Sequence, residues 1–182
     1  MSELFIDPGF SKKGKGNAYS LFEGGHLTHT AFIRFDRSKA RPCLGVRVSV
    51  VVVERPEYQG ARTLAARVQD SMTLCWEGAL TAAHFAVELH ADLVEWAPSE
   101  WKGQEPKPMM HARLWEALTP QEQELLGGEA TRREIWKARE RGALKRWPPG
   151  EHFYPEKFIT HNLLDTVAMG CVYHGRIEKR VR

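Results

Sequence analysis

Three carboxylates in this chain lie where an isolated charge would be costly. Asp7 follows the short apolar run at residues 4–6, Glu54 follows four consecutive valines, and Asp165 interrupts an apolar stretch. An unpaired carboxylate loses its solvation in a dry environment, and three neighbouring carboxylates repel one another unless a cation neutralises them. Hard Mg²⁺ prefers carboxylate oxygens as ligands. Together the three acids predict a divalent-metal site.

Such a site would suit phosphodiester hydrolysis. Two ions about 4 Å apart can activate water and stabilise the leaving oxygen, so the protein itself supplies no nucleophile. A structural interpretation exists for each acid alone: Asp7 opens a turn, Glu54 pairs with Arg55 or Arg62, and Asp165 caps a helix. The combination of all three, in this order, favours the metal site.

Hydrophobic periodicity predicts the strands that must position these acids. Strands are expected at residues 4–6, 17–22, 26–35, 46–53 and 92–96, with a hairpin turn at 23–25. The run at 50–53 is fully apolar, which is typical of a strand buried on both faces. Three antiparallel strands followed by a helix, a strand and further helices predict an α/β domain with a mixed sheet.

The same periodicity predicts the helices. One helical face is marked by apolar side chains three to four residues apart, at Leu64, Val68, Met72, Cys75 and Ala79. Further helices are expected at 109–118, from Pro120, at 131–147 and at 163–173, and the segment 100–108 is polar and contains two prolines. Thr119 is predicted to cap the helix that starts at Pro120, with Glu122 as its capping-box partner.

Four motifs in this order resemble the RuvC-type Holliday junction resolvases. They are Phe-Ile-Asp-Pro-Gly at 5–9, Val-Glu at 53–54, Trp-Ala-Pro-Ser-Glu-Trp-Lys-Gly at 96–103 with Lys107 following, and Asn-Leu-Leu-Asp-Thr-Val-Ala at 162–168. The resemblance implies a ribonuclease H-like fold whose central five-stranded mixed sheet, three antiparallel strands then parallel strands, is flanked by helices. It also implies a homodimer, two Mg²⁺ or Mn²⁺ ions per active site, and paired nicks in four-way DNA junctions.

The resemblance leaves the fourth metal ligand open between His161 and Asn162. Both residues can share a helix face with Asp165; imidazole is the stronger donor, whereas the family pattern favours position 162. Alternatively, Thr160 and Asn162 simply cap the helix. Lys107 is implied to orient the scissile phosphate or the attacking water, and it is counted with the catalytic residues.

Basic and aromatic residues predict where DNA would lie. The stretch 131–146 carries seven basic residues against two acids, a plausible phosphate-binding stripe, although a solvated helix face would look similar. Tyr58 lies near the position of a family aromatic that stacks on bases. The predicted DNA-binding residues are Lys12, Lys13, Lys15, Tyr58, Arg62, Lys102, Arg132, Arg133, Lys137, Arg139, Arg141, Lys145 and Arg146.

Composition sets the broad class. The 182 residues carry a formal net charge of +3, with 42% hydrophobic and 27% charged residues, so one domain (1–182) with a basic helical insertion at about 119–149 is expected. The odd count of three cysteines argues against a disulfide framework, and each cysteine is expected to be a small buried hydrophobe. With no signal-peptide pattern or membrane-length apolar run, we expect a cytoplasmic protein, bacterial or in the host cell if virus-encoded.

The sequence therefore predicts a metal-dependent endodeoxyribonuclease that resolves four-way junctions. Two alternatives remain open: a ribonuclease H-like nuclease acting on flaps or RNA–DNA hybrids, and a non-catalytic junction-binding protein.

Overall fold

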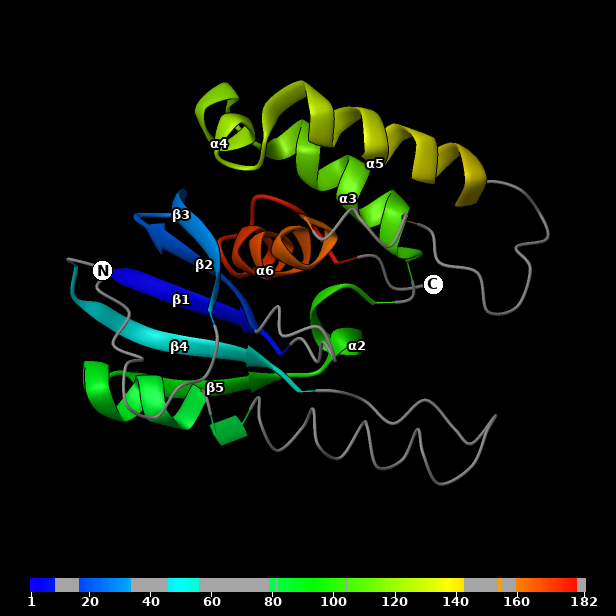
Figure 1. Ribbon diagram of the computed structural model, residues 1–182. Helices are drawn as coiled ribbons and strands as arrows, with labels where there is room; N and C mark the ends of the chain where they lie inside the picture. Colours follow the sequence, from blue (N-terminus) through cyan, green and yellow to red (C-terminus); the bar gives the residue numbers. More distant parts are fainter. Residues whose placement is uncertain are drawn as a thin grey trace.

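A five-stranded mixed sheet forms the centre of the molecule (Figure 1). The computed structural model describes residues 1–8, 17–33, 46–55, 79–80, 82–103, 105–142, 154 and 160–179. The strands are β1 (Ser2–Asp7), β2 (Asn17–Glu23), β3 (His26–Ile33), β4 (Val48–Glu54) and β5 (Asp92–Trp96), in the order β3-β2-β1-β4-β5. β1, β2 and β3 pair antiparallel, whereas β4 pairs parallel with both β1 and β5. The predicted sheet, three antiparallel strands and then parallel strands, is confirmed.

The two central strands are buried on both faces, as the valine run predicts. Phe5 of β1 and Val52 of β4 belong to the apolar core on one face of the sheet, and their chain neighbours belong to the core on the other face. Side chains alternate along a strand. Asp7 and Glu54, each two residues further on, therefore lie on the same face as Phe5 and Val52.

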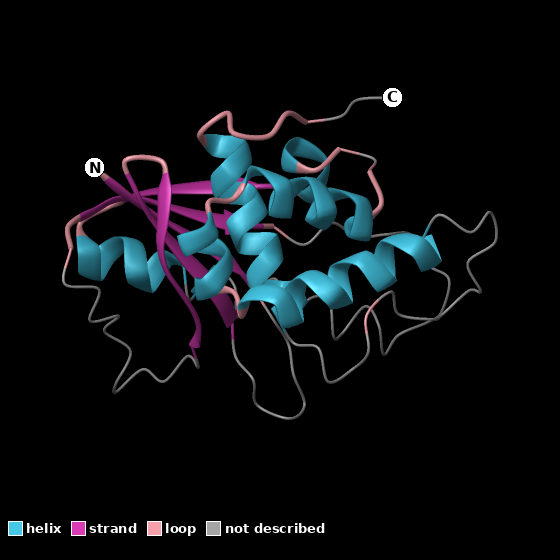
Figure 2. Ribbon diagram, turned by 90° about the horizontal axis from the view of Figure 1, so that it is seen from above, coloured by secondary structure: helices cyan, strands magenta, loops and turns pink. Residues whose placement is uncertain are grey.

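Helices cover both faces of the sheet. They are α2 (Pro98–Trp101), α3 (Lys107–Ala117), α4 (Pro120–Leu125), α5 (Gly128–Gly142) and α6 (Thr160–Tyr173). On one face α6 packs against β1 and β2, α3 packs on α6, and α5 packs on α3 (Figures 1 and 2). On the other face the helical residues 79–80 and 82–89 place Phe85 against the sheet.

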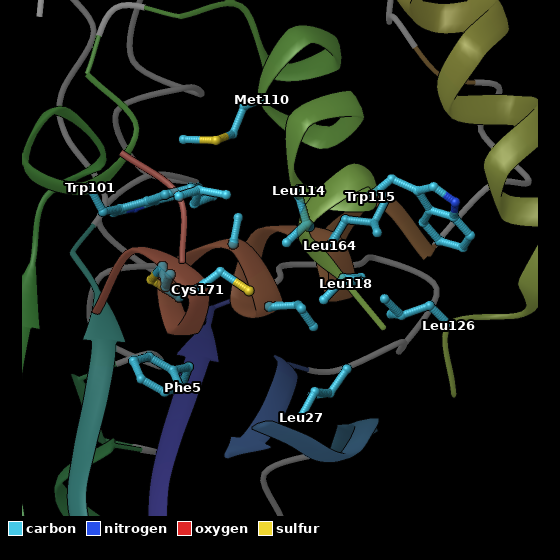
Figure 3. Close-up of a cluster of buried hydrophobic side chains, with 14 of the residues drawn as sticks. Phe5, Leu27, Trp101, Met110, Leu114, Trp115, Leu118, Leu126, Leu164 and Cys171 are labelled. Atoms are coloured by element: carbon cyan, nitrogen blue, oxygen red, sulfur yellow. The ribbon is translucent and has the colours of Figure 1, made fainter. Parts of the chain in front are cut away.

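α6 is apolar nearly all round because it lies between the sheet and α3. Figure 3 shows Phe5 of β1 on one side of this helix and Leu114 of α3 on the other. Burial of one such side chain stabilises the fold by about 1.5–3 kcal/mol. At Gly170 a Cβ atom would lie 2.2 Å from Cε2 of Phe22, so the approach of α6 to β2 requires glycine.

The helix prediction between residues 98 and 109 is wrong in two respects. α3 begins at Lys107 rather than at residue 109, and residues 98–101 form α2, so the polar segment 100–108 contains the end of α2 and the start of α3. Pro106 is the N-cap of α3 and Pro108 lies in its first turn, where a missing N–H costs no hydrogen bond. The two prolines are therefore compatible with a helix that begins at Lys107.

Other elements differ by a few residues from their predicted bounds. α6 begins at Thr160 rather than at residue 163, so Asn162 lies inside the helix and does not cap it. α5 begins at Gly128 rather than at residue 131, after a turn in which Gly127 has a φ of +93°. β4 runs from Val48 to Glu54, and β5 matches its prediction.

The predicted capping box of α4 is confirmed. The Thr119 hydroxyl accepts the Glu122 N–H at 3.3 Å, and Glu122 Oε2 accepts the Thr119 N–H at 2.8 Å. Glu122 has a second role, because both its oxygens accept from Arg176 at 2.6 Å and Oε1 also accepts from Leu27 N–H at 2.8 Å. This buried carboxylate therefore joins α4, the β2–β3 hairpin and the segment after α6.

Some predictions fall on residues outside the described ranges. These are the helical face at Leu64, Val68, Met72 and Cys75, and the environments of Cys43 and Cys75. Cys171 is buried, as predicted. No helix among the described residues is long and apolar enough to cross a membrane.

Candidate active site

Asp7 and Glu54 end two neighbouring parallel strands at the same edge of the sheet. β1 and β4 pair with Ile6 opposite Val53, so the two acids follow at the next level of the register. Figure 1 shows β1, β4 and β5 all pointing toward α2 at this edge. The carboxyl ends of parallel strands thus bring the first two predicted acids together.

Asp165 joins them from α6, where it is only 5% exposed. α3 holds both of its oxygens: Lys107 Nζ contacts Oδ2, and His111 Nε2 lies 2.9 Å from Oδ1. Lys107 and His111 are four residues apart and so share one face of α3. Burial by itself would raise the pKa of Asp165, but the Lys107 charge and the His111 hydrogen bond hold that pKa well below its usual value.

The other two acids shift in the opposite direction. Burial, followed by the charges of Glu54 and Asp165, raises the pKa of Asp7 well above its usual value. Burial and the charge of Asp165 raise the pKa of Glu54 to about 7. The three carboxylates are therefore near enough to repel one another, and the positive charge around them is insufficient to keep all three ionised.

Two lysines supply part of that positive charge. Burial would lower the pKa of Lys107, but Asp165, Asp7 and Glu54 outweigh burial, and the pKa is raised. Lys102 lies with its Nζ 5.5 Å from the centre of the Trp101 ring, and its charge lowers the pKa of both Asp7 and Glu54. The edge of the sheet thus carries three acids and two ammonium groups.

The donor set fits a hard divalent cation by chemistry. Three carboxylates that repel one another are the ligands and the charge that Mg²⁺ or Mn²⁺ requires. Within the described parts of the chain, however, no three His, Cys, Asp or Glu side chains converge closely enough to hold a metal ion. Asp165 is engaged by Lys107 and His111 instead. A cation on Asp165 Oδ2 would have to share or replace the contact with Lys107.

The two candidates for a fourth ligand both lie in the first turn of α6. His161 Nδ1 is 3.3 Å from Lys107 Nζ, and the His161 ring stacks on Tyr154 with centroids 5.6 Å apart and planes 10° apart. Asn162 is half-buried in the same turn. The contact with Lys107 links His161 to the acid group, while the choice between His161 and Asn162 stays open.

Sequence reasoning missed three residues at this site. Trp101 donates its Nε1–H to Glu54 Oε2 at 3.0 Å, His111 bonds Asp165, and Tyr154 OH lies 2.7 Å from His111 Nδ1. The four-residue spacing between Lys107 and His111 could have identified His111, had the helix been predicted to begin at Lys107. Tyr154 carries no such signal, because its contact is made only by tertiary structure.

The predicted DNA-binding residues are only partly described. Lys12, Lys13, Lys15, Tyr58, Arg62, Lys145 and Arg146 lie outside the described ranges. The five basic residues of α5 are exposed or half-exposed, because Thr131, Ile135 and Ala138 form its buried face. They are Arg132, Arg133, Lys137, Arg139 and Arg141.

Two of the five basic side chains on α5 have acidic partners. Arg132 pairs with Glu129 at 3.1 Å and lies over the Trp136 ring, and Lys137 pairs with Glu134 at 2.8 Å. Exposed pairs of this kind are weak, so they leave the basic side chains able to exchange partners.

The chain is similar to two solved structures from Thermus thermophilus. One, described as T. thermophilus RuvC in complex with Holliday junction substrate, gives a TM-score of 0.44 at 14% identity, covering 94% of this chain and 91% of that chain. The other, a T. thermophilus RuvC structure, gives 0.36 at 17% identity, covering 94% and 92%. The sequence matches no family profile and no curated protein. Both scores are low, so the architecture is established by the strand order and directions.

Proposed function

We propose that this protein is a divalent-metal-dependent endodeoxyribonuclease that resolves four-way DNA junctions by paired nicks. The observation that carries the proposal is the proximity of Asp7, Glu54 and Asp165 at one sheet edge, where the charge of Asp165 raises the pKa of both other acids and the charge of Glu54 raises the pKa of Asp7. Structural carboxylates are normally paired with cations one to one. Here three acids share an incomplete set of positive charges, which supports a cation-binding role.

The residues of the site would have different roles, according to their chemistry. Asp7, Glu54 and Asp165 would hold the ions, with His161 or Asn162 completing the set. When bound, two Mg²⁺ or Mn²⁺ ions would supply Lewis acidity that activates water and stabilises the leaving oxygen. Lys107, already at Asp165 Oδ2, would hold a scissile phosphate oxygen as a point charge.

Junction selectivity and a homodimer are proposed on the four sequence motifs. A paired nick needs two active sites, which a symmetric dimer supplies. A nuclease acting on flaps or RNA–DNA hybrids would use the same acids, so the alternatives differ in substrate rather than in site. A non-catalytic junction-binding protein would not require the three acids to remain together.

α5 is proposed to contact DNA phosphates. It packs back along α3, so its C-terminal end lies toward the end of α3 that carries Lys107 (Figure 1). Replacing Arg133, Arg139 and Arg141 with glutamine should weaken junction binding, and the slope of log K against log salt should become shallower by about one for each phosphate that the variant no longer neutralises. Arg47→Gln, just before β4, is the control and should change neither quantity. An unchanged salt slope in the triple variant would remove α5 from the interface.

The proposal is tested by cleavage of a synthetic four-way junction and a linear duplex of the same sequence, with Mg²⁺, Mn²⁺ or EDTA. Paired, metal-dependent nicks confined to the junction are expected, and they should disappear in Glu54→Gln. A flap and an RNA–DNA hybrid assayed beside the junction separate the alternative substrates. Tight junction binding without cleavage under any metal would support the binding protein instead.

A further inference from the structure

Two fully buried rings each direct one ring nitrogen at a carboxylate of the site. Trp101 on α2 and His111 on α3 are both 0% exposed. Trp101 Nε1 donates to Glu54 Oε2 at 3.0 Å, and His111 Nε2 lies 2.9 Å from Asp165 Oδ1. In both cases the ring engages a single oxygen of the carboxylate; the second oxygen of Asp165, Oδ2, is in contact with Lys107 Nζ.

The hydrogen positions at His111 follow from its two neighbours. An ionised carboxylate only accepts hydrogen bonds, so Nε2 must carry a hydrogen. In a neutral imidazole whose hydrogen is on Nε2, Nδ1 is an acceptor. Tyr154 OH, 2.7 Å away, therefore donates to Nδ1. The chain of donors runs from Tyr154 through His111 to Asp165, and it fixes both the tautomer and the ring orientation.

Trp101 has a simpler constraint. An indole is a donor only, so its sole polar group is committed to Glu54. The ring is packed in the core cluster with Met110 and Leu164 (Figure 3). A ring that cannot move holds its N–H in one direction, and the carboxylate that accepts the hydrogen bond is held with it.

We propose that Trp101 and His111 are positioning residues for the cation site: they hold Glu54 Oε2 and Asp165 Oδ1, so that Glu54 Oε1 and Asp165 Oδ2 are the oxygens presented to the metal. This inference rests on the proposed function. It also places Lys107 beside the metal-binding oxygen, because Lys107 Nζ contacts the same Asp165 Oδ2. The ammonium group of Lys107 therefore neutralises the same oxygen that a divalent ion would bind.

The test measures Mn²⁺ affinity of the full chain directly, by electron paramagnetic resonance of free Mn²⁺. His111→Leu and Trp101→Phe remove the N–H donors while leaving an apolar side chain, and each should weaken Mn²⁺ binding by about 10- to 100-fold. His111→Gln should restore most of the affinity, because its amide can donate to Asp165 and accept from Tyr154. Such rescue is not expected if His111 only fills space.

Two matched controls separate positioning from general loss of stability. His174 Nε2 also lies near a carboxylate, 3.3 Å from Glu3 Oε2, but at the opposite end of β1, so His174→Leu should leave Mn²⁺ affinity unchanged. Trp115 lies in the same core cluster as Trp101, so Trp115→Phe is the control for Trp101→Phe and should also leave Mn²⁺ affinity unchanged. Thermal unfolding of every variant in EDTA records the structural cost.

If the wild type binds Mn²⁺ and neither Trp101→Phe nor His111→Leu binds it more weakly than the controls, the positioning role is overturned, whatever the nuclease assay gives. If the variants lose affinity but the wild type cleaves no nucleic acid, the positioning role stands and the nuclease proposal fails. Should His111→Leu not fold, Tyr154→Phe removes the hydroxyl behind His111 and should weaken Mn²⁺ binding in the same direction. Unchanged affinity in that variant and in Trp101→Phe would refute the inference.

Discussion

Replacing Glu54 with glutamine should stabilise the metal-free protein at alkaline pH. Burial first, and the charge of Asp165 second, raise the pKa of Glu54 from 4.5 to about 7. For an acid whose pKa rises on folding, the folded state favours the protonated form. The contribution of Glu54 to stability is therefore highest below about pH 4.5, and it is lost as the pH rises through about 7. Glutamine cannot ionise and escapes this loss.

The size of the effect follows from the shift. A rise from 4.5 to about 7 corresponds to about 3 kcal/mol of unfavourable ionisation at about pH 8. Glu54 is half-buried, and solvent reduces this figure, so a gain of about 2–3 kcal/mol is expected. For a chain of this length that corresponds to an increase of roughly 4–12 °C in Tm. The hydrogen bond from Trp101 survives, because the amide oxygen of glutamine can accept it.

The assay is thermal unfolding in EDTA, followed by circular dichroism at about pH 5 and about pH 8. The gain in Glu54→Gln should be large at the higher pH and small at the lower one. Glu95→Gln provides the matched control, since Glu95 is exposed on the neighbouring strand β5 and should change stability at neither pH. If Glu54→Gln were no more stable than the wild type at about pH 8, Glu54 would not be an ionised group crowded by other acids.

The remaining predictions concern stability measured in EDTA. Asp165→Asn should destabilise the protein by about 3–5 kcal/mol near neutral pH, the opposite sign to Glu54→Gln, because Lys107 loses its buried counter-charge. The pKa of Asp165 is lowered, so this loss should shrink as the pH falls below about 4; a pH-independent loss would contradict the pairing. Glu122→Gln should cost about 3–5 kcal/mol in urea unfolding, because Arg176 is left unpaired; a neutral effect would show that solvent compensates it. Gly170→Ala should lower the free energy of unfolding by about 1–3 kcal/mol or more, because its Cβ would meet a phenylalanine ring of β2. The measurement is the decrease in Tm.

Local pattern was sufficient for most of the sheet. The alternation and the valine run predicted β4 within two residues at its start and one at its end, because strand burial is encoded in side chains a fixed distance apart. The hairpin turn follows from Gly24 and Gly25, both with positive φ, and the capping box of α4 needs only Thr119 and Glu122. In each of these cases the interacting residues are neighbours in the chain.

Prediction failed where distant residues decide the outcome. One failure was local: the start of α3 was predicted two residues late, at residue 109, although a helix tolerates proline in its first turn. Glu122 was interpreted as a local cap, and its bond to Arg176, 54 residues away, has no local signature. Tyr154 meets His111 across 43 residues for the same reason.

The sequence alone determined where the three acids lie along the chain, because Asp7 and Glu54 terminate apolar runs and Asp165 interrupts another. It did not determine what those acids touch. Only the tertiary structure decided that α3 holds both oxygens of Asp165 and that Trp101 holds one oxygen of Glu54. The physical reason is that strand and helix periods are set by neighbouring residues, whereas the partners of a buried charge are set by which elements the folded core packs side by side.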